Sequence, residues 1–232
     1  LGEGVSKPAS VGGGAVGYGT QFESFWCCYT TAIDQWTKMS DSIYFYRNSS
    51  VYVHLFVSSE LAWMERQAVI QQLTAFPREA TTNLTISTTR DQVTMDVHLR
   101  VPSWIVSNES WIEVNGVRQA VQLSPSTYVQ LPKLNWQAND RIVYHMGMSV
   151  RFEAINDNAQ LVSILYGPVV LGGLVPRAKA LSNDPSRIRK ISRTSSEPLL
   201  FETIALDGTT FQLLPLYEII NQTYTVYFPI SE

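Results

Sequence analysis

The fold is decided by the stretch Val93-Thr94-Met95-Asp96-Val97-His98-Leu99-Arg100-Val101, in which every odd position is apolar and every even position is polar. Successive side chains of a β-strand point to opposite faces of a sheet. Strict alternation therefore predicts a strand with one face in a hydrophobic core and the other face outside it. The same period of two reappears along much of the chain after Tyr44.

Further runs of this kind predict the remaining strands of a first β domain. They lie at residues 51–57, 111–114, 117–119, 128–131 and 141–146. Asn115-Gly116, between two of them, is a dipeptide that favours a two-residue hairpin turn. Short strands about ten residues apart, joined by polar turns, are typical of a β-sandwich. We expect this sandwich to occupy residues 44–150.

A second block of strands is predicted at residues 159–166, 169–171, 210–214 and 224–228. We expect these strands to form a second β-sandwich-like domain over residues 151–232. A polar segment at residues 176–198 connects them and carries six basic side chains, which are Arg177, Lys179, Arg187, Arg189, Lys190 and Arg193. We interpret this segment as a solvated connecting loop, with a polyanion site as the alternative.

One helix is predicted, at residues 25–43, where apolar side chains recur at steps of three and four and form a stripe. The stripe consists of Phe25, Tyr29, Ala32, Ile33, Trp36, Met39 and Ile43. A stripe this broad needs a partner to pack against, and no second helix of comparable quality follows in the sequence. We expect residues 1–43 to consist of a glycine-rich loop and this helix.

Two adjacent cysteines, Cys27 and Cys28, are the only ones in the 232 residues. Adjacent Cα atoms lie about 3.8 Å apart and an unstrained disulfide needs roughly 4.4–6.8 Å, so we expect no bond between the two. In the first turn of a helix, the free N–H groups and the positive dipole end favour thiolate over thiol. The pattern is compatible with burial, with pairing to cysteines of another chain, with metal ligation and with nucleophilic chemistry.

Four Asn-x-Ser/Thr sequons begin at Asn48, Asn83, Asn108 and Asn221. This density predicts a secreted or extracellular glycoprotein. The sequence starts with neither an initiating Met nor a signal segment. We therefore expect it to begin after processing or inside a longer polypeptide.

The composition, with 45% hydrophobic and 16% charged residues, is that of a packed globular protein. A formal net charge of −3 gives no electrostatic reason to bind nucleic acid. No apolar run reaches the roughly 20 residues of a membrane span. His54, His98 and His145 fall within predicted strands and lack metal-ligand spacing, so we interpret them as structural.

A set of short motifs runs along nearly the whole chain. They are Ser24-Phe25-Trp26-Cys27-Cys28-Tyr29, Ile33-Asp34, Lys38, Asp41-Ser42-Ile43-Tyr44-Phe45, Leu99-Arg100-Val101-Pro102-Ser103-Trp104, Ile112-Glu113-Val114-Asn115-Gly116, Leu165-Tyr166-Gly167-Pro168-Val169-Val170-Leu171-Gly172-Gly173, Pro215-Leu216-Tyr217-Glu218-Ile219 and Tyr224-Thr225-Val226-Tyr227-Phe228. In this order they resemble glycoside hydrolase family 127, which includes β-L-arabinofuranosidases.

The resemblance implies a mainly β chain of two β-sandwich domains, preceded by the last helix of an α/α barrel that is otherwise absent from the sequence. It also implies a retaining glycosidase that removes terminal furanose sugars such as β-L-arabinofuranose. In the family, the first cysteine of the pair is the nucleophile and the second helps to hold zinc. The matching residues are Cys27 and Cys28, and we expect both to contact the metal.

Retaining glycosidases usually use a carboxylate nucleophile, which a thiol can replace when zinc keeps it ionised. In the family, the remaining zinc ligands and the acid/base glutamate come from the barrel. The resemblance therefore implies that this chain is inactive alone and that its partner is a barrel segment, covalently attached or associated.

Two other functions stay open. Many relatives carry Gly-Thr-Gly where this chain has Thr30-Thr31-Ala32, and the loss of both glycines changes the backbone beside the cysteines. This departure and the missing barrel favour a non-catalytic extracellular glycoprotein or adhesion module. A carbohydrate-binding module that uses exposed aromatic side chains is the third reading.

Overall fold

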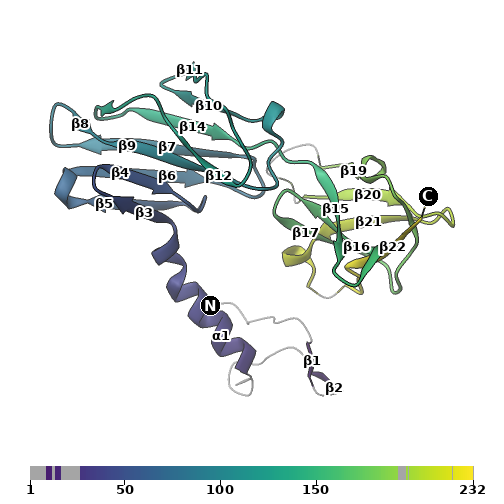
Figure 1. The fold of residues 1–232 in the computed structure, drawn as a ribbon. Helices are drawn as coiled ribbons and strands as arrows, with labels where there is room; N and C mark the ends of the chain where they lie inside the picture. The colour runs from purple at the N-terminus through teal and green to yellow at the C-terminus, as the bar shows by residue number, and fades with distance from the viewer. Residues whose placement is uncertain are drawn as a thin grey trace.

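A computed structural model describes residues 9–11, 14–16, 27–192, 197, 199–220 and 222–231, with side chains from residue 31 onward. Most of its elements are strands, and they form two β units (Figure 1). The helix α1 (Cys27–Lys38) continues through the 3₁₀ turn η1 (Met39–Ser42) into the first unit. A short hairpin of β1 (Ala9–Val11) and β2 (Gly14–Val16) comes earlier in the chain. The mainly β fold predicted from the sequence is confirmed.

The first unit is a sandwich of two sheets. The larger sheet has the order β11-β10-β14-β7-β6-β5 and comprises β5 (Ser59–Trp63), β6 (Ala68–Thr74), β7 (Thr81–Thr88), β10 (Trp111–Val114), β11 (Val117–Arg118) and β14 (Arg141–His145). The smaller has the order β12-β9-β4-β3 and comprises β3 (Tyr44–Arg47), β4 (Ser50–Val53), β9 (Asp96–Val101) and β12 (Thr127–Gln130). A separate pair joins β8 (Val93–Thr94) to β13 (Asn135–Trp136). The connections include η2 (Met64–Arg66) and η3 (Ser107–Glu109).

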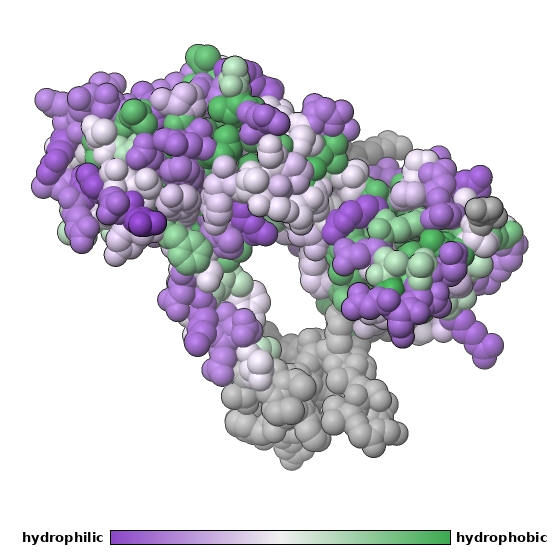
Figure 2. Space-filling model, viewed as in Figure 1, coloured by the Kyte–Doolittle hydropathy of each residue, from purple (hydrophilic) through white to green (hydrophobic). Residues whose placement is uncertain are grey.

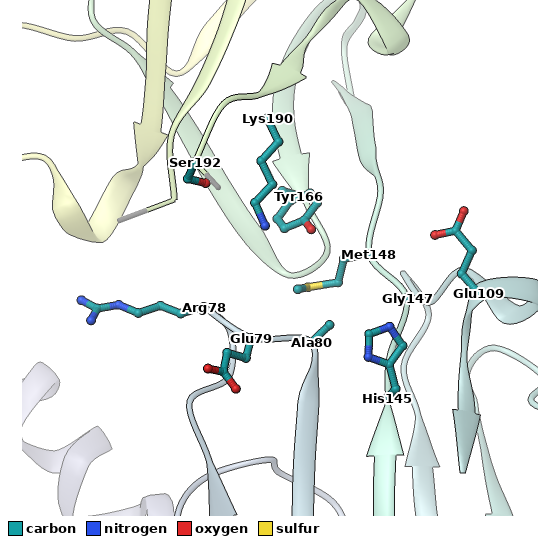
Figure 3. A pocket seen from close by; sticks show the side chains of 10 residues that line it. All are labelled: Arg78, Glu79, Ala80, Glu109, His145, Gly147, Met148, Tyr166, Lys190 and Ser192. Atoms are coloured by element: carbon teal, nitrogen blue, oxygen red, sulfur yellow. The ribbon is translucent and has the colours of Figure 1, made fainter. Parts of the chain in front are cut away.

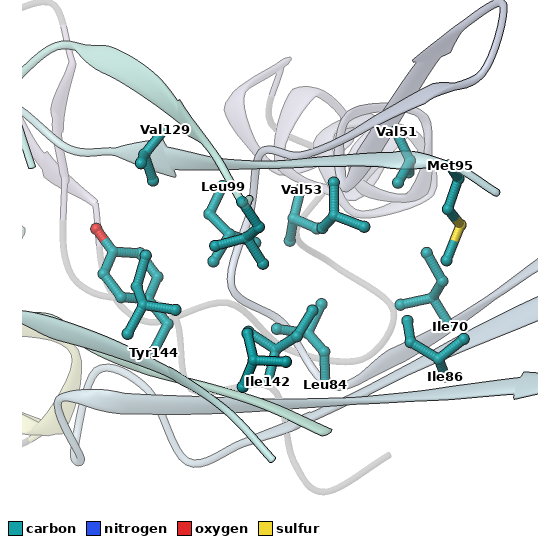
Figure 4. Close-up of a cluster of buried hydrophobic side chains, with 14 of the residues drawn as sticks. Val51, Val53, Ile70, Leu84, Ile86, Met95, Leu99, Val129, Ile142 and Tyr144 are labelled. Carbon is teal, nitrogen blue, oxygen red and sulfur yellow. The ribbon is translucent and has the colours of Figure 1, made fainter. Parts of the chain in front are cut away.

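The core of this unit lies between its two sheets (Figure 4). Val53 and Leu99 reach into it from the smaller sheet, and Leu84 and Ile142 face them from the larger one. All four are fully buried. Burying each such side chain stabilises the fold by about 1.5–3 kcal/mol. The alternation at residues 93–101 is confirmed, because all five apolar residues of that stretch are buried.

The predicted turn at Asn115-Gly116 is also confirmed. Both residues have positive φ, at 52° and 78°, as a two-residue hairpin of this type requires. The strand predicted at residues 51–57 was too long, since β4 ends at Val53. Beyond it, the N–H groups of His54 and Leu55 both bond the carbonyl of Ile43 instead of a neighbouring strand.

The sequence missed two central strands, β6 and β7. In β6 the inward position 72 carries a glutamine that is fully buried, while Leu73 is 56% exposed. The Nε2 group of Gln72 donates to the carbonyls of Leu55 and Val57, at 3.0 and 2.6 Å. These bonds satisfy the buried side-chain NH2 group of Gln72, whereas its Oε1 has no hydrogen-bond partner among the described residues. Hydrophobic patterning cannot place such a buried polar side chain.

The second unit is formed by one hydrogen-bonded sheet with its own core. Its main order is β18-β22-β16-β17-β21-β20-β19, and β15 pairs with β16. The strands are β15 (Val150–Ile155), β16 (Asn158–Tyr166), β17 (Val169–Gly173), β18 (Leu181–Ser182), β19 (Arg189–Lys190), β20 (Phe201–Ile204), β21 (Thr210–Pro215) and β22 (Tyr227–Ser231), with 3₁₀ turns η4 (Pro185–Arg187) and η5 (Leu216–Glu218). Phe201 and Phe228 are fully buried in the core. The last strand begins later than the predicted residue 224, because Thr225 makes only an isolated bridge to Gly173.

Removing the hydroxyl of Tyr144 tests the sandwich core. Tyr144 is fully buried, and its hydroxyl has no hydrogen-bond partner among the residues that the structure describes. A buried hydroxyl without a partner is destabilising. Tyr144→Phe should therefore raise the free energy of unfolding by about 1 kcal/mol.

The matched control is Tyr44→Phe, because the hydroxyl of Tyr44 is hydrogen-bonded to Ser59 Oγ at 3.0 Å. This variant should lower the free energy of unfolding by about 1 kcal/mol in urea titrations. Equal losses in both variants would contradict the packing of Tyr144.

Candidate functional site

The cysteine pair lies at the start of α1, which the structure describes from Cys27 onward. The predicted helix is thus confirmed, although its last four residues before Ile43 form the tighter turn η1. The backbone places both cysteines in the first turn, and this turn contains no acidic residue. The positive end of the helix dipole thus lies at a turn that carries no carboxylate of its own.

Two thiols fit half of a zinc site, because zinc in proteins takes four ligands and accepts cysteine sulfur readily. Among the described residues, no group of three or more His, Cys, Asp or Glu side chains could hold a metal ion. The zinc site stays a prediction.

The helix α1 stands out from the β units (Figures 1 and 2). Every residue from Thr31 to Lys38 is exposed. The apolar side chains of Ile33 and Trp36 are 64% and 73% exposed, so the described residues leave this part of the predicted stripe uncovered, whereas Ile43 at its end is buried. A helix of 12 residues is marginally stable in water by itself. Within the described part of the chain, Ile33 and Trp36 thus form an uncovered apolar surface on the element that carries the cysteines.

Next to α1, the outer face of the smaller sheet carries five rings, and we name this surface the ring face. Its members are Phe45, Tyr52, His54, His98 and Tyr128. The register aligns Phe45, Tyr52 and His98 across three neighbouring strands. The rings of Tyr52 and His98 stack with centroids 4.4 Å apart. Cross-strand pairs of this kind stabilise a sheet and fix its register.

The histidines of the ring face favour their neutral forms. Burial lowers the pKa of His54, and the nearby Arg100 guanidinium lowers it further. Burial also lowers the pKa of His98, against the opposing effect of Asp96. Nδ1 of His54 is hydrogen-bonded to the hydroxyl of Tyr128. The ring face therefore presents mainly neutral rings, with the Arg100 guanidinium beside them.

The sequence analysis predicted His54 and His98 in strands, but it did not predict that the two rings lie on the same face. His98 lies in β9, and His54 directly follows β4, the strand that pairs with β9 in parallel. Tyr52, His54, His98 and Arg100 occupy the outward positions of two alternating runs, which is a signal present in the sequence. Recognising it requires knowing that β4 and β9 are neighbours, and parallel pairing of distant strands has no local signature.

The other predicted positions divide into described and undescribed residues. Asn48, Asn83 and Asn108 are exposed, as glycan acceptors must be, whereas Asn221 lies outside the described residues. In the 176–198 segment, Lys179, Arg187 and Arg189 form ion pairs with carboxylates, at 2.8, 4.0 and 3.0 Å. This pairing favours the interpretation as a solvated loop. Across the described ranges, no helix is long and apolar enough to cross a membrane.

A family model matches most of the first β unit. Residues 50–148 match the family model described as the GH127 middle domain of β-L-arabinofuranosidase. A GH127 β-L-arabinofuranosidase from Geobacillus stearothermophilus has the same fold, with a TM-score of 0.70 at 18% identity, over 91% of this chain and 38% of its own. No curated protein matches the chain.

Two further solved structures agree. One described as a glycoside hydrolase gives a TM-score of 0.70 at 17% identity, over 92% of this chain and 41% of its own. Another, described as a GH127 β-arabinofuranosidase, gives 0.68 at 19% identity, over 88% of this chain and 38% of its own. The chain thus spans about two fifths of the length of these structures.

The ring face predicts how stability depends on pH. His54 and His98 bind protons less readily in the folded chain than their ordinary pKa of 6.5 implies. The unfolded chain therefore takes up more protons as the pH falls, and the free energy of unfolding should decrease as the pH drops through 6.5. Above that pH the full stability is retained.

Urea titrations between about pH 8 and pH 5 measure this dependence. The double variant His54→Asn and His98→Asn should flatten the curve, leaving the share of His145, whose pKa burial also lowers. An unchanged slope in the double variant would show that the two rings are not desolvated.

Proposed function

We propose, from the premise that residues 50–148 are a GH127 middle domain, that the chain is the C-terminal part of a secreted retaining glycoside hydrolase. The enzyme would remove a terminal furanose sugar, such as β-L-arabinofuranose, from a glycan. The observation that carries this proposal is the position of Cys27 and Cys28, at the start of the helix that leads into this domain. Two of the similar structures are described as arabinofuranosidases, which supports the choice of sugar.

In the proposed reaction, Cys27 is the nucleophile. Its thiolate attacks the anomeric carbon while a carboxyl group protonates the departing glycosidic oxygen, and the C–O bond breaks as the C–S bond forms. Water, deprotonated by the same carboxylate, then attacks the anomeric carbon and the thiolate departs. Two displacements at one carbon retain its configuration. The helix dipole at Cys27 supports the thiolate in both steps.

Cys28 would hold zinc together with Cys27, and a bound zinc ion would keep both sulfurs ionised at neutral pH. We propose that an α/α-barrel segment supplies the remaining ligands and the acid/base carboxyl group. The uncovered stripe of α1 supports this proposal, because an apolar helix face needs packing that the described residues do not provide. Such a partner would also explain why the similar structures are longer than this chain.

Secretion is part of the same proposal. Three exposed sequon asparagines, Asn48, Asn83 and Asn108, support glycosylation outside the cytosol. Asn83 lies in the central strand β7 but projects outward between the buried residues Thr82 and Leu84. A glycan at that position would thus leave the core packing intact.

Cysteine variants of the longest gene product that contains this chain test the function. We expect about one zinc per chain and release of p-nitrophenol from p-nitrophenyl β-L-arabinofuranoside. Cys27→Ser should lower kcat by roughly a thousandfold or more, because no other group can form the covalent intermediate. Cys28→Ser should lower both the zinc content and the activity.

Two controls separate this enzyme from a non-catalytic glycoprotein. Alkylation of Cys27 should abolish turnover, and zinc bound beforehand should slow that alkylation. A metal-free protein without turnover, with Cys27 in a disulfide, would contradict the proposed enzyme and support a structural module. Unchanged turnover in Cys27→Ser would exclude the proposed nucleophile.

The α1 stripe gives a separate prediction. Replacing Ile33 and Trp36 by Ser should leave the stability of the 232-residue chain within about 0.5 kcal/mol, because both side chains are exposed there. In the barrel-containing protein the same double variant should cost about 2–5 kcal/mol. Thermal unfolding of both proteins measures the difference.

The control is Gln35→Ser, on an exposed polar position of the same helix. It should be nearly neutral in both proteins. Equal effects of the apolar double variant in the two proteins would show that no barrel segment packs on the stripe.

A further inference from the structure

A cavity of about 360 Å³ lies at the junction of the two β units, and we name it the junction cavity (Figure 3). Its polar lining consists chiefly of Arg78, Glu79, Glu109, His145, Tyr166 and Lys190. These residues come from the β6–β7 loop, η3, β14, β16 and β19, so both units contribute. The volume falls within the range of about 300–1,000 Å³ that is typical of small-ligand sites.

The walls of the junction cavity are held by close contacts. A Cβ on Gly147 would lie 2.7 Å from Cβ of Glu109. Only glycine therefore fits where the segment between β14 and β15 passes η3. Arg78 donates to Glu218 Oε1 at 2.8 Å and ties the first unit to the second. The ring of His145 is fixed by a 3.0 Å hydrogen bond between Nδ1 and Thr81 Oγ1 and by stacking on Trp111. The cavity is therefore a shaped space between positioned groups.

Several groups at this cavity have hydrogen-bonding capacity to spare. The ammonium group of Lys190 lies 5.3 Å from the ring centroid of Tyr166 and forms no ion pair with a described residue. Lys190 is exposed as a whole, and partial burial of its amine lowers its pKa. The carboxylates of Glu79 and Glu109 likewise form no ion pair within the described ranges, and Figure 3 shows them at opposite edges of the cavity, with the Glu79 carboxylate turned away from Lys190. Donors and acceptors thus surround the same space.

The charges select the class of ligand. Two carboxylates at the rim oppose an anion, while Lys190 opposes a cation. A neutral polyol offers hydroxyl oxygens to the ammonium group and hydroxyl protons to the carboxylates, and its C–H face can contact the Met148 thioether that projects into the centre (Figure 3). We propose that the junction cavity binds one neutral monosaccharide unit of a glycan. This inference goes beyond the proposed hydrolysis and does not depend on the cysteines.

The three histidines of the chain provide a direct readout. Millimolar L-arabinose or D-galactose, added to the 232-residue chain, should shift the imidazole NMR signal of His145 in a saturable manner. The signals of His54 and His98, on the ring face, should stay in place. Equal concentrations of D-galacturonate should produce a weaker effect, because its carboxylate meets Glu79 and Glu109.

Two variants test whether the sugar binds in the junction cavity. Lys190→Met and Glu109→Gln should each weaken the binding of the neutral sugar roughly tenfold, as expected for the loss of a charge-assisted hydrogen bond. The matched controls Arg177→Met and Glu65→Gln remove the same charges at exposed positions away from the cavity and should bind normally. Unchanged unfolding midpoints verify that all four variants fold.

Three results would overturn the proposal. They are no shift of His145 at saturating sugar, preferential binding of galacturonate, and full binding by both cavity variants. Because none of these readouts uses Cys27 or zinc, failure here leaves the proposed hydrolase untouched, and failure of the hydrolase leaves this site to be judged separately.

Discussion

The packing of two sheets around one apolar layer is the constraint on which the other features depend. Val97, Leu99 and Val101 are fully buried in that layer, and this fixes which face of β9 points inward. With a period of two, His98 and Arg100 must then point outward. The outward position of the β9 members of the ring face follows from this orientation, and the register of β4 with β9 sets Tyr52 beside His98.

Local patterns in the sequence predicted the parts of the fold that local physics decides. The alternating run at residues 93–101, the hairpin at Asn115-Gly116 and the helix at the cysteines depend on neighbours in the chain, and the structure bears them out. Strand β6 was not predicted from the sequence, because its buried position 72 carries a glutamine. The side-chain NH2 group of Gln72 donates to carbonyls of a segment that is distant in the sequence. The junction cavity was not predicted either, since its residues come from both units.

The candidate catalytic site is only partly present in this chain, as the pair Cys27 and Cys28. Adjacent cysteines and family motifs pointed to a nucleophile and a metal, and the structure places the pair at a helix start. Among the described residues no group of three or more His, Cys, Asp or Glu side chains could hold a metal ion, and the zinc site remains a proposal. The uncovered face of α1 is consistent with the proposed barrel segment.

The claim that Cys27 and Cys28 hold zinc is tested most directly by a zinc X-ray absorption spectrum. The sample is the protein that contains this chain together with its proposed barrel. The account predicts a shell of sulfur atoms at about 2.3 Å from the metal, reduced by one in Cys28→Ser. Zinc surrounded only by nitrogen and oxygen, or a sulfur shell unchanged in that variant, would contradict it.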